Sequence, residues 1–248
     1  MFKFVKLEDC LPPCASFGYF YSMSPTSRQK PREPKRVRIP GKRALNKAEK
    51  LRRIKEAARH LFLSQGFDDT TTRAIADRAD VALGTLFTYA SNKRDLLFLV
   101  GNDMLEEMSR AATGNIRPHL SVMRNLLDAF RPLYTFFKTQ PKLSRLILRE
   151  LVFYDSGKQA ERAIATRMEM ISVVTAIIEN AIEKGEIVSK ADPKQIGWII
   201  FSIYQAEIRF WLREDKLNVD DGLDQLRRAL LLCFSGMKLT RPKRNWRS

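Results

Sequence analysis

The segment TTTRAIADRADVALGTLFTYASNKRDL, residues 70–96, decides the fold of this chain. It begins with Thr71, whose hydroxyl oxygen can cap a first short helix over residues 72–79. Residues 80–82 form a tight turn, and a second short helix is predicted over residues 83–90. Two such helices joined by a short turn are typical of a helix-turn-helix, whose second helix lies in the major groove of DNA.

The composition favours an all-α protein. The 248 residues include 44% hydrophobic residues but only 11 Gly and 11 Pro, and apolar residues recur at helical spacing over long stretches. Three cysteines do not form an even disulfide framework, which indicates a reducing, cytoplasmic setting. Cys10 and Cys14 could ligate a metal, but no further His or Cys lies nearby, so neither a metal nor a cofactor is predicted. No segment reaches the roughly twenty apolar residues of a membrane span.

The positive charge is concentrated at the two ends of the chain. The net charge is +16, and residues 1–96 carry 20 Lys and Arg against 10 Asp and Glu. Residues 97–237 are nearly neutral, with 19 against 18, and residues 238–248 add five basic residues and no acidic one. A basic region beside a neutral body is the electrostatic footprint of a nucleic-acid binder. Charge that serves only solubility would be spread more evenly.

Four regions are therefore expected along the chain. Residues 1–46 are predicted to be a disordered basic arm that contacts DNA phosphates, and Met23 is a candidate for the true start. Residues 47–96 are predicted to form a helix-turn-helix domain, residues 97–237 a helical body, and residues 238–248 a basic tail. The predicted helices cover residues 47–65, 72–79, 83–90, 93–112, 121–138, 141–153, 158–184, 193–213 and a last one from 220. Pro132 is expected either to kink its helix or to begin a new segment.

A longer pattern surrounds the helix-turn-helix. It comprises Gly66-Phe67, Thr70-Thr71, Ile75-Ala76, Ala79, Val81, Gly84-Thr85-Leu86-Phe87, Tyr89, Asn92-Lys93 and Asp95-Leu96. This pattern resembles the DNA-binding domain of TetR-type (TetR/AcrR) bacterial transcriptional regulators. The resemblance implies an N-terminal three-helix domain joined to a larger helical ligand-binding and dimerisation domain. Three positions depart from the family pattern, because Asp80, Ala82 and Ala90 stand where Gly, Ser and Phe are usual.

The chemistry of the motif suggests roles for its exposed positions. Phosphate contacts, which position a protein on DNA without reading bases, are expected from Thr71, Thr72, Tyr89 and Lys93. Contacts to base edges or methyl groups are expected from Arg73, Leu83, Thr85 and Thr88, although Leu83 could equally be a surface residue without this role. Ile75, Val81, Leu86 and Phe87 are predicted to be core residues that set the angle between the helices. The full candidate DNA-binding set is Thr71, Thr72, Arg73, Ala82, Leu83, Gly84, Thr85, Phe87, Thr88, Tyr89 and Lys93.

The resemblance also implies an apolar ligand pocket in the body. Its candidate lining is Phe130, Tyr134, Phe137, Phe153, Met168, Ile171, Trp198, Phe201 and Tyr204, although aromatic and Met side chains at helical spacing are more often plain core. Glu150, Glu207 and Arg209 could orient a polar group of the ligand or could lie at the surface. The two long apolar helices that close the chain resemble the pair through which such regulators dimerise, and the alternative is that both are buried within one subunit.

The sequence bears on three classes of function. An enzyme is not expected, because the sequence has no glycine-rich phosphate loop, nucleophile elbow or cluster of metal ligands. A protein that coats DNA without sequence preference would explain the charge but not the large neutral body. The sequence therefore predicts a dimeric transcriptional regulator, more readily a repressor than an activator. It is expected to bind a palindromic operator and to leave it when a small-molecule effector binds.

Overall fold

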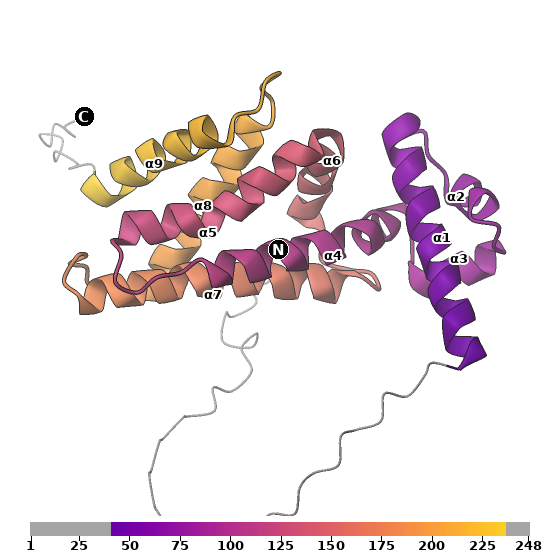
Figure 1. The fold of residues 1–248 in the computed structure, drawn as a ribbon, viewed down its shortest axis with the longest axis horizontal. Coiled ribbons are helices and arrows are strands. Elements are labelled where there is room, and N and C mark those ends of the chain that lie inside the picture. The colour runs from indigo at the N-terminus through magenta and orange to yellow at the C-terminus, as the bar shows by residue number, and fades with distance from the viewer. Residues whose placement is uncertain (1–40, 237–248) are drawn as a thin grey trace, which may run out of the picture. The chain divides into compact units, whose positions relative to one another are not determined.

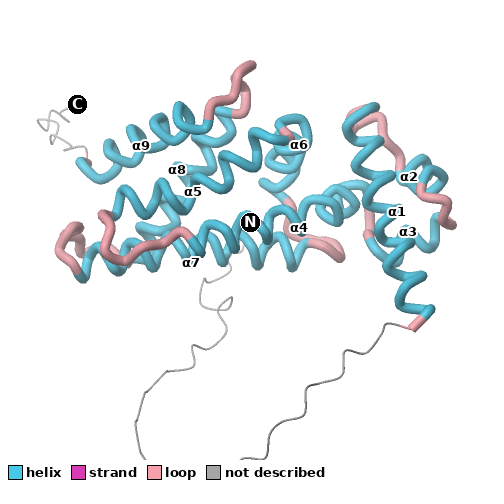
Figure 2. The backbone as a smooth tube through the Cα atoms, in the orientation of Figure 1, coloured by secondary structure: helices cyan, strands magenta, loops and turns pink. Residues whose placement is uncertain are grey.

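The computed structural model describes residues 41–236. The candidate start at Met23, the Cys10 and Cys14 pair, most of the predicted basic arm and the basic tail lie outside these residues. Every regular element in the described part is a helix, which confirms the predicted all-α class (Figure 2). No helix in this part combines the length and the apolarity that a membrane crossing requires.

The described residues form nine α-helices and one 3-10 turn. The α-helices are labelled in Figure 1. Their bounds are α1 (Lys42–Ser64), α2 (Thr72–Arg78), α3 (Leu83–Tyr89), α4 (Lys93–Gly114), α5 (Val122–Thr139), α6 (Pro141–Glu150), η2 (Leu151–Phe153), α7 (Ala160–Glu183), α8 (Pro193–Trp211) and α9 (Val219–Ser235).

Helix α1 begins earlier than the sequence predicted. Residues 42–46, expected at the end of the disordered arm, are helical, and the N–H groups of Ala44 and Leu45 donate to the Gly41 carbonyl at 2.8 and 3.2 Å. The first turns of this helix are fully exposed, so no apolar periodicity marks them. Lys, Arg and Ala are nevertheless good helix formers, and their propensity extends the helix toward Gly41.

The first three helices pack around a small apolar core. Ile54, Ala58 and Phe62 from α1 are buried together with Ile75 from α2 and Leu86 from α3. The chain leaves α1 through Gly66, whose φ of 87° lies in the left-handed region that favours glycine. Phe67 then folds back, and its ring centroid lies 5.4 Å from that of Phe62. These contacts hold the helix-turn-helix against α1.

Helix α5 continues through Pro132 without ending there. Proline has no N–H, so the carbonyl of Asp128, four residues earlier, loses its helical donor. The Asn115 side-chain amide, from the end of α4, donates to this carbonyl at 3.3 Å. Of the two predicted alternatives, one helix through Pro132 or a new segment that begins there, the structure has the first. A neighbouring side chain replaces the missing hydrogen bond.

The core of the body is aromatic. Tyr134 on α5 and Tyr204 on α8 are almost fully buried, and the Phe130 ring stacks on Tyr204 with centroids 4.3 Å apart. Helix α9 reaches this cluster through Gly222, where an added Cβ would lie 2.7 Å from Tyr134 Cε1 and 2.8 Å from Trp211 Cδ1. Only a residue without a side chain allows this approach.

Candidate DNA-binding surface and ligand cavity

The turn between α2 and α3 has the geometry that a helix-turn-helix requires. The Ala74 N–H donates to Thr71 Oγ1 at 3.1 Å, so Thr71 caps α2 as predicted. Asp80 has a φ of 50°, a left-handed conformation that Asp tolerates better than most residues. Its carboxylate accepts a hydrogen bond of 2.8 Å from Arg53 Nη1 on α1. The departure from the usual Gly at Asp80 therefore preserves the turn and adds a contact to α1.

Helix α3 presents small and polar side chains to solvent. Its N-cap is Ala82, which makes no side-chain capping bond. Gly84 is exposed, and an added Cβ there would meet no atom within 4 Å. Leu86 is fully buried, whereas Phe87, predicted as a core residue, is 38% exposed. The next residue along a helix points away by about 100°, so Leu86 and Phe87 cannot share one buried face.

All eleven candidate DNA-binding residues have side chains at the surface of the described unit. Thr71, Arg73, Ala82, Gly84, Phe87 and Thr88 are exposed, and Thr72, Leu83, Thr85, Tyr89 and Lys93 are partly exposed. Leu83 also packs against the core of the unit. The exposed residues belong to the start of α2 and to α3, which are the parts of a helix-turn-helix that face DNA.

Two of the proposed phosphate contacts are held by neighbouring backbone carbonyls. The Tyr89 hydroxyl donates to the Lys47 carbonyl at 3.3 Å, which connects α3 to α1. Lys93 Nζ donates to the Asp68 carbonyl at 2.9 Å and lies 4.7 Å from the centroid of the Phe67 ring. A lysine has three donors, and a tyrosine hydroxyl also accepts, so these contacts leave capacity for a phosphate.

Asp95, the third residue of α4, forms a buried junction that the sequence did not identify. Its carboxylate accepts hydrogen bonds from the Ser91, Gln159 and Lys158 N–H groups at 2.6, 2.8 and 2.9 Å, and from the Tyr154 hydroxyl. Burial alone would raise the pKa of Asp95, but the hydrogen bonds outweigh it and hold the pKa below its usual range. One carboxylate thus joins the end of the helix-turn-helix to the loop before α7.

Gly157 permits this junction. Its φ is 125°, and an added Cβ would lie 2.7 Å from Asp95 Oδ1. The Tyr154 ring stacks on Phe98 of α4, with centroids 3.9 Å apart. Asp95 and the loop that holds Tyr154 and Gly157 are about sixty residues apart, and neither carries a local signal that they meet, so the sequence alone could not find this contact.

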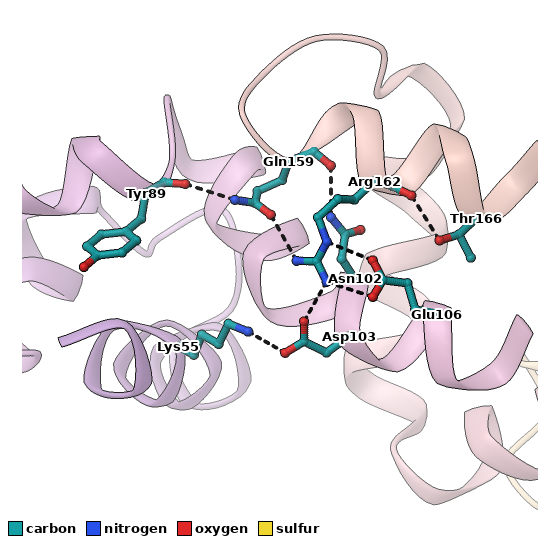
Figure 3. Close-up of polar contacts among 8 residues, drawn as sticks. All are labelled: Lys55, Tyr89, Asn102, Asp103, Glu106, Gln159, Arg162 and Thr166. Atoms are coloured by element: carbon teal, nitrogen blue, oxygen red, sulfur yellow. Dashed lines mark hydrogen bonds and ion pairs between the residues drawn. The ribbon is translucent and has the colours of Figure 1, made fainter. Parts of the chain in front are cut away.

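Polar side chains at the start of α7 extend the junction, as Figure 3 shows. Gln159 Nε2 donates to the carbonyl of Tyr89 at 3.1 Å. Arg162 donates through Nε and Nη2 to Glu106 at 2.8 and 2.9 Å, and through Nη2 to Asp103 at 2.8 Å.

The same network reaches two further elements. Lys55 on α1 also pairs with Asp103, so α1, α4 and α7 share these charges (Figure 3). One turn further along α7, the Thr166 hydroxyl donates to the Arg162 carbonyl at 3.0 Å. A continuous set of hydrogen bonds and ion pairs therefore runs from α3 into α7.

A small cavity lies in the body beside Thr166. Its volume is about 40 Å³, room for about three waters. Helices α4 to α8 and η2 line it with Leu105, Met108, Ser109, Leu133, Phe137, Leu148, Leu151, Ala163, Thr166, Arg167, Met170, Phe201, Tyr204 and Gln205. The lining is mostly apolar with a few polar groups, which is typical of a small-molecule site.

Three of the nine residues predicted for the pocket line this cavity, namely Phe137, Phe201 and Tyr204. Phe130, Tyr134 and Ile171 are buried in the core but do not line it. Phe153, Met168 and Trp198 are 80%, 37% and 42% exposed and lie at the surface. Helical spacing identifies an apolar stripe on a helix, but it does not show whether that stripe faces the core or the surface. These three residues lie outside the cavity.

A larger, more open cleft lies between the end of α1 and α6. Its volume is about 380 Å³, and its lining includes Phe62 and Phe67 with three basic residues, Lys142, Arg145 and Arg149. Arg149 already pairs with Asp68 and Glu150, and Arg145 donates to the Leu212 carbonyl at 2.6 Å. Because these contacts hold the two arginines at the surface, we regard the cavity among α4 to α8 as the better ligand site.

An exposed helix-turn-helix attached to a helical body with an apolar cavity defines a DNA-binding transcriptional regulator. Comparison with known proteins agrees. The family described as bacterial regulatory proteins, tetR family, matches residues 54–100. The uncharacterized HTH-type transcriptional regulator YhgD of Bacillus subtilis is 29% identical over 163 residues, 65% of this chain and 83% of that protein. The chain is thus similar to the TetR family of bacterial transcriptional regulators, through the family match to its helix-turn-helix region and through relatives that are named transcriptional regulators.

Two further relatives extend the comparison. The HTH-type transcriptional repressor KstR of Mycobacterium tuberculosis is 26% identical over 189 residues, 74% of this chain and 81% of that protein. The crystal structure of Thermus thermophilus FadR, a TetR family transcriptional repressor in complex with lauroyl-CoA, superposes with a TM-score of 0.58 at 23% identity. That match covers 78% of this chain and 97% of FadR, and it shows that the two share a fold.

Proposed function

We propose that this protein is a homodimeric repressor that leaves a palindromic operator when a small apolar or amphipathic ligand enters the cavity among α4 to α8. Residues 47–96 act as the DNA-binding domain, residues 97–237 as the ligand-binding and dimerisation domain, and the eleven surface residues as the DNA contacts. The similarity to the repressor KstR and to the fold of FadR, which is described with lauroyl-CoA, supports this assignment. A regulator of this kind acts in the cytoplasm, where bacterial DNA lies.

The observation that carries this proposal is the polar path along α7. Thr166 lines the cavity, and its hydroxyl is bonded to the Arg162 carbonyl, while Gln159 on the preceding turn holds the Tyr89 carbonyl at the end of α3. Functional ligand pockets usually measure about 300–1,000 Å³, so a ligand must widen this cavity of about 40 Å³. A ligand that favours the widened arrangement shifts the population away from the arrangement that fits DNA.

The outer faces of α8 and α9 support a dimer. They expose large apolar side chains, namely Trp198, Ile199, Phe210, Leu231 and Leu232, which are 42–58% exposed. Large exposed apolar patches mark interaction sites more often than free surface. Two subunits joined here can place their α3 helices in successive major grooves about 34 Å apart. Size-exclusion chromatography with light scattering tests this, and a monomer at micromolar concentration would contradict it.

Fluorescence anisotropy tests the response to ligand. The full chain is titrated onto a labelled duplex from the DNA that flanks its own gene, with and without lauroyl-CoA, dodecanoate or dodecanol. We expect at least one of these ligands to weaken DNA binding, and a reciprocal weakening of ligand binding by the operator. Unchanged affinity with all three would contradict ligand-controlled release.

Two other functions make different predictions. An activator of the same family would bind upstream of its promoter and raise transcription there, whereas a repressor would overlap the promoter. A DNA-coating protein would show a steep salt dependence without a preferred site. The large cavity-bearing body favours the regulator over the coating protein.

A further inference from the structure

Two arginines, one lining the cavity and the other bonded to a lining residue, have no acidic partner among the described residues. Arg167 on α7 is half-buried and lines the cavity. Arg209 on α8 is also half-buried, and it donates to the side-chain oxygen of Gln205, another lining residue, at 2.6 Å. Among the described residues, no carboxylate lies within 4.0 Å of either guanidinium group, whereas Arg162 on the same helix pairs with two acids.

The hydrogen bonds of the two arginines use only part of their capacity. Arg167 Nη2 donates to the Leu151 carbonyl at 3.0 Å, and Arg209 Nη2 donates to the Leu148 carbonyl at 3.3 Å. Arg209 Nη1 contacts the carbonyl and the side-chain oxygen of Gln205. A guanidinium carries five N–H donors, so Arg167 in particular keeps several of them unused within the described structure.

Burial disfavours the charged form of both arginines. It lowers the pKa of Arg167 and the pKa of Arg209; at Arg209, Tyr204 opposes this lowering and the positive charge of Arg167 adds to it. The Leu151 and Leu148 carbonyls ease this only in part. A half-buried pair of like charges is costly unless a counter-charge arrives.

We propose that Arg167 and Arg209 bind the anionic head group, a carboxylate or a phosphate, of an amphipathic ligand whose apolar chain fills the cavity among Met108, Phe137 and Phe201. This inference rests on the proposed ligand-controlled function and specifies the chemical class of the ligand. Guanidinium groups bind carboxylates and phosphates through paired N–H donors, which gives orientation as well as energy. The apolar residues that line the cavity then pack against the hydrocarbon chain of the ligand and exclude water from the ion pair.

The alternative is that both arginines serve only to bond the carbonyls that end α6 and η2. Removing a purely structural arginine would destabilise the protein and weaken every ligand alike. Removing a head-group residue would weaken anionic ligands alone and leave the free protein about as stable, because a like-charge pair is also removed. The two roles therefore differ in what a single substitution does.

Calorimetric titration of the full chain with four ligands that share a dodecyl chain tests the proposal. The ligands are dodecanoate, dodecyl phosphate, dodecanol and dodecyltrimethylammonium, each used below its micelle concentration. We expect one or both anions to bind about tenfold or more tightly than the alcohol, and the ammonium to bind most weakly. The tighter of the two anions identifies the head group as a carboxylate or a phosphate.

Matched variants complete the experiment. Arg167→Met keeps an apolar side chain and should cost the anions about tenfold in affinity without changing the binding of dodecanol. Arg110 is an exposed α4 residue whose side chain makes no hydrogen bond or ion pair among the described residues, and Arg110→Met should change neither. If dodecanol or the ammonium binds native protein as tightly as the tighter of the two anions, or if Arg167→Met weakens all ligands equally, the head-group assignment is wrong. Dodecanol that binds as tightly as both anions and releases the operator would leave the proposed repressor intact while overturning this inference.

Discussion

Two arginines five residues apart on α7 have opposite surroundings. Arg162 faces the junction with the helix-turn-helix, where Glu106 and Asp103 accept its hydrogen bonds at 2.8–2.9 Å. Arg167 faces the cavity and bonds a neutral carbonyl only, at 3.0 Å, among the described residues. The junction is complete within the chain, whereas the cavity side of the helix carries charge that nothing in the described chain neutralises. Under the proposed function, the side of α7 that carries Arg162 passes the signal to the helix-turn-helix, and the side that carries Arg167 receives the ligand.

The junction should depend most strongly on Asp95. In Asp95→Asn, one carboxylate oxygen becomes an NH₂ group that faces at least one backbone N–H, so at least one hydrogen bond is lost and the others lose the negative charge of their acceptor. We expect the free energy of unfolding to fall by about 3 kcal/mol, measured by urea unfolding near neutral pH. Asp155→Asn, an exposed position in the same loop, is the control and should change it by less than about 0.5 kcal/mol. Equal effects of the two variants would show that the buried junction does not stabilise the fold.

The effect of Asp95→Asn should also depend on pH. The native pKa of Asp95 lies below its usual range, so its stabilisation is complete above the unfolded pKa of about 3.9. It is lost as the pH falls through the lower native pKa. Native protein and Asp95→Asn should therefore differ constantly between about pH 5 and 8 and converge in more acidic solution, as pH-dependent unfolding would show. A difference that grows in acid would contradict a lowered pKa.

The two arginines of α7 can be compared directly. Arg162→Met should lower the free energy of unfolding by about 1–2 kcal/mol, because it leaves Glu106 and Asp103 without a shared partner in a partly exposed network. Arg167→Met should change it by no more than about 0.5 kcal/mol, because the lost carbonyl bond is offset by the lost repulsion with Arg209. Thermal unfolding of both variants measures the two changes in the free energy of unfolding. Equal losses of stability would show that the two arginines do not differ in this way.

Substitutions of Tyr89 and Lys93, which lie on the DNA-binding surface next to the junction, should change the affinity for DNA. Tyr89→Ala and Lys93→Ala are each expected to weaken binding about tenfold on every duplex tested, since phosphate contacts do not read sequence. Lys93→Ala should also reduce the salt dependence of binding by about one phosphate contact. Tyr89→Phe separates the hydroxyl from the ring, and Lys138→Ala, an exposed residue of α5, is the charge control. Anisotropy that shows unchanged affinity for both alanine variants would remove the phosphate assignment.

The smallest effect is expected at Ala82. The N-cap of α3 makes no side-chain hydrogen bond, and Ala82→Ser can supply one to the start of this short helix. We expect a gain of about 0.5–1 kcal/mol in the free energy of unfolding, with Ala82→Gly closer to native protein. Differential scanning calorimetry measures it. A destabilised Ala82→Ser would mean that the start of α3 has no room for a cap.

The helix-turn-helix could be predicted in detail because its signals are local. Thr71 as a cap, Gly66 as a helix end and the spacing of Ile75 and Leu86 depend on neighbours a few residues away. The start of α1 was missed because an exposed helix has no apolar periodicity. Phe87 was placed in the core, although its neighbour Leu86 occupies the buried face.

The cavity was only partly predictable, because its walls come from separate helices. Phe137, Phe201 and Tyr204 were found, since they belong to strongly apolar stripes. Arg167 was missed, because a charged residue on an amphipathic helix normally faces solvent, and only the packing of η2 and α8 shows that it faces the cavity. The Asp95 junction likewise joins residues about sixty positions apart, which no local pattern reveals.

Footprinting of the purified full chain on the DNA that flanks its own gene tests the central claim most directly. The account predicts one protected site with two-fold symmetry, in which the centres of the half-sites lie about 34 Å or a multiple of it apart. It also predicts that protection is lost when a ligand that binds the cavity is added. Uniform protection without a preferred site, or no protection at any concentration that keeps the protein soluble, would contradict a sequence-specific regulator.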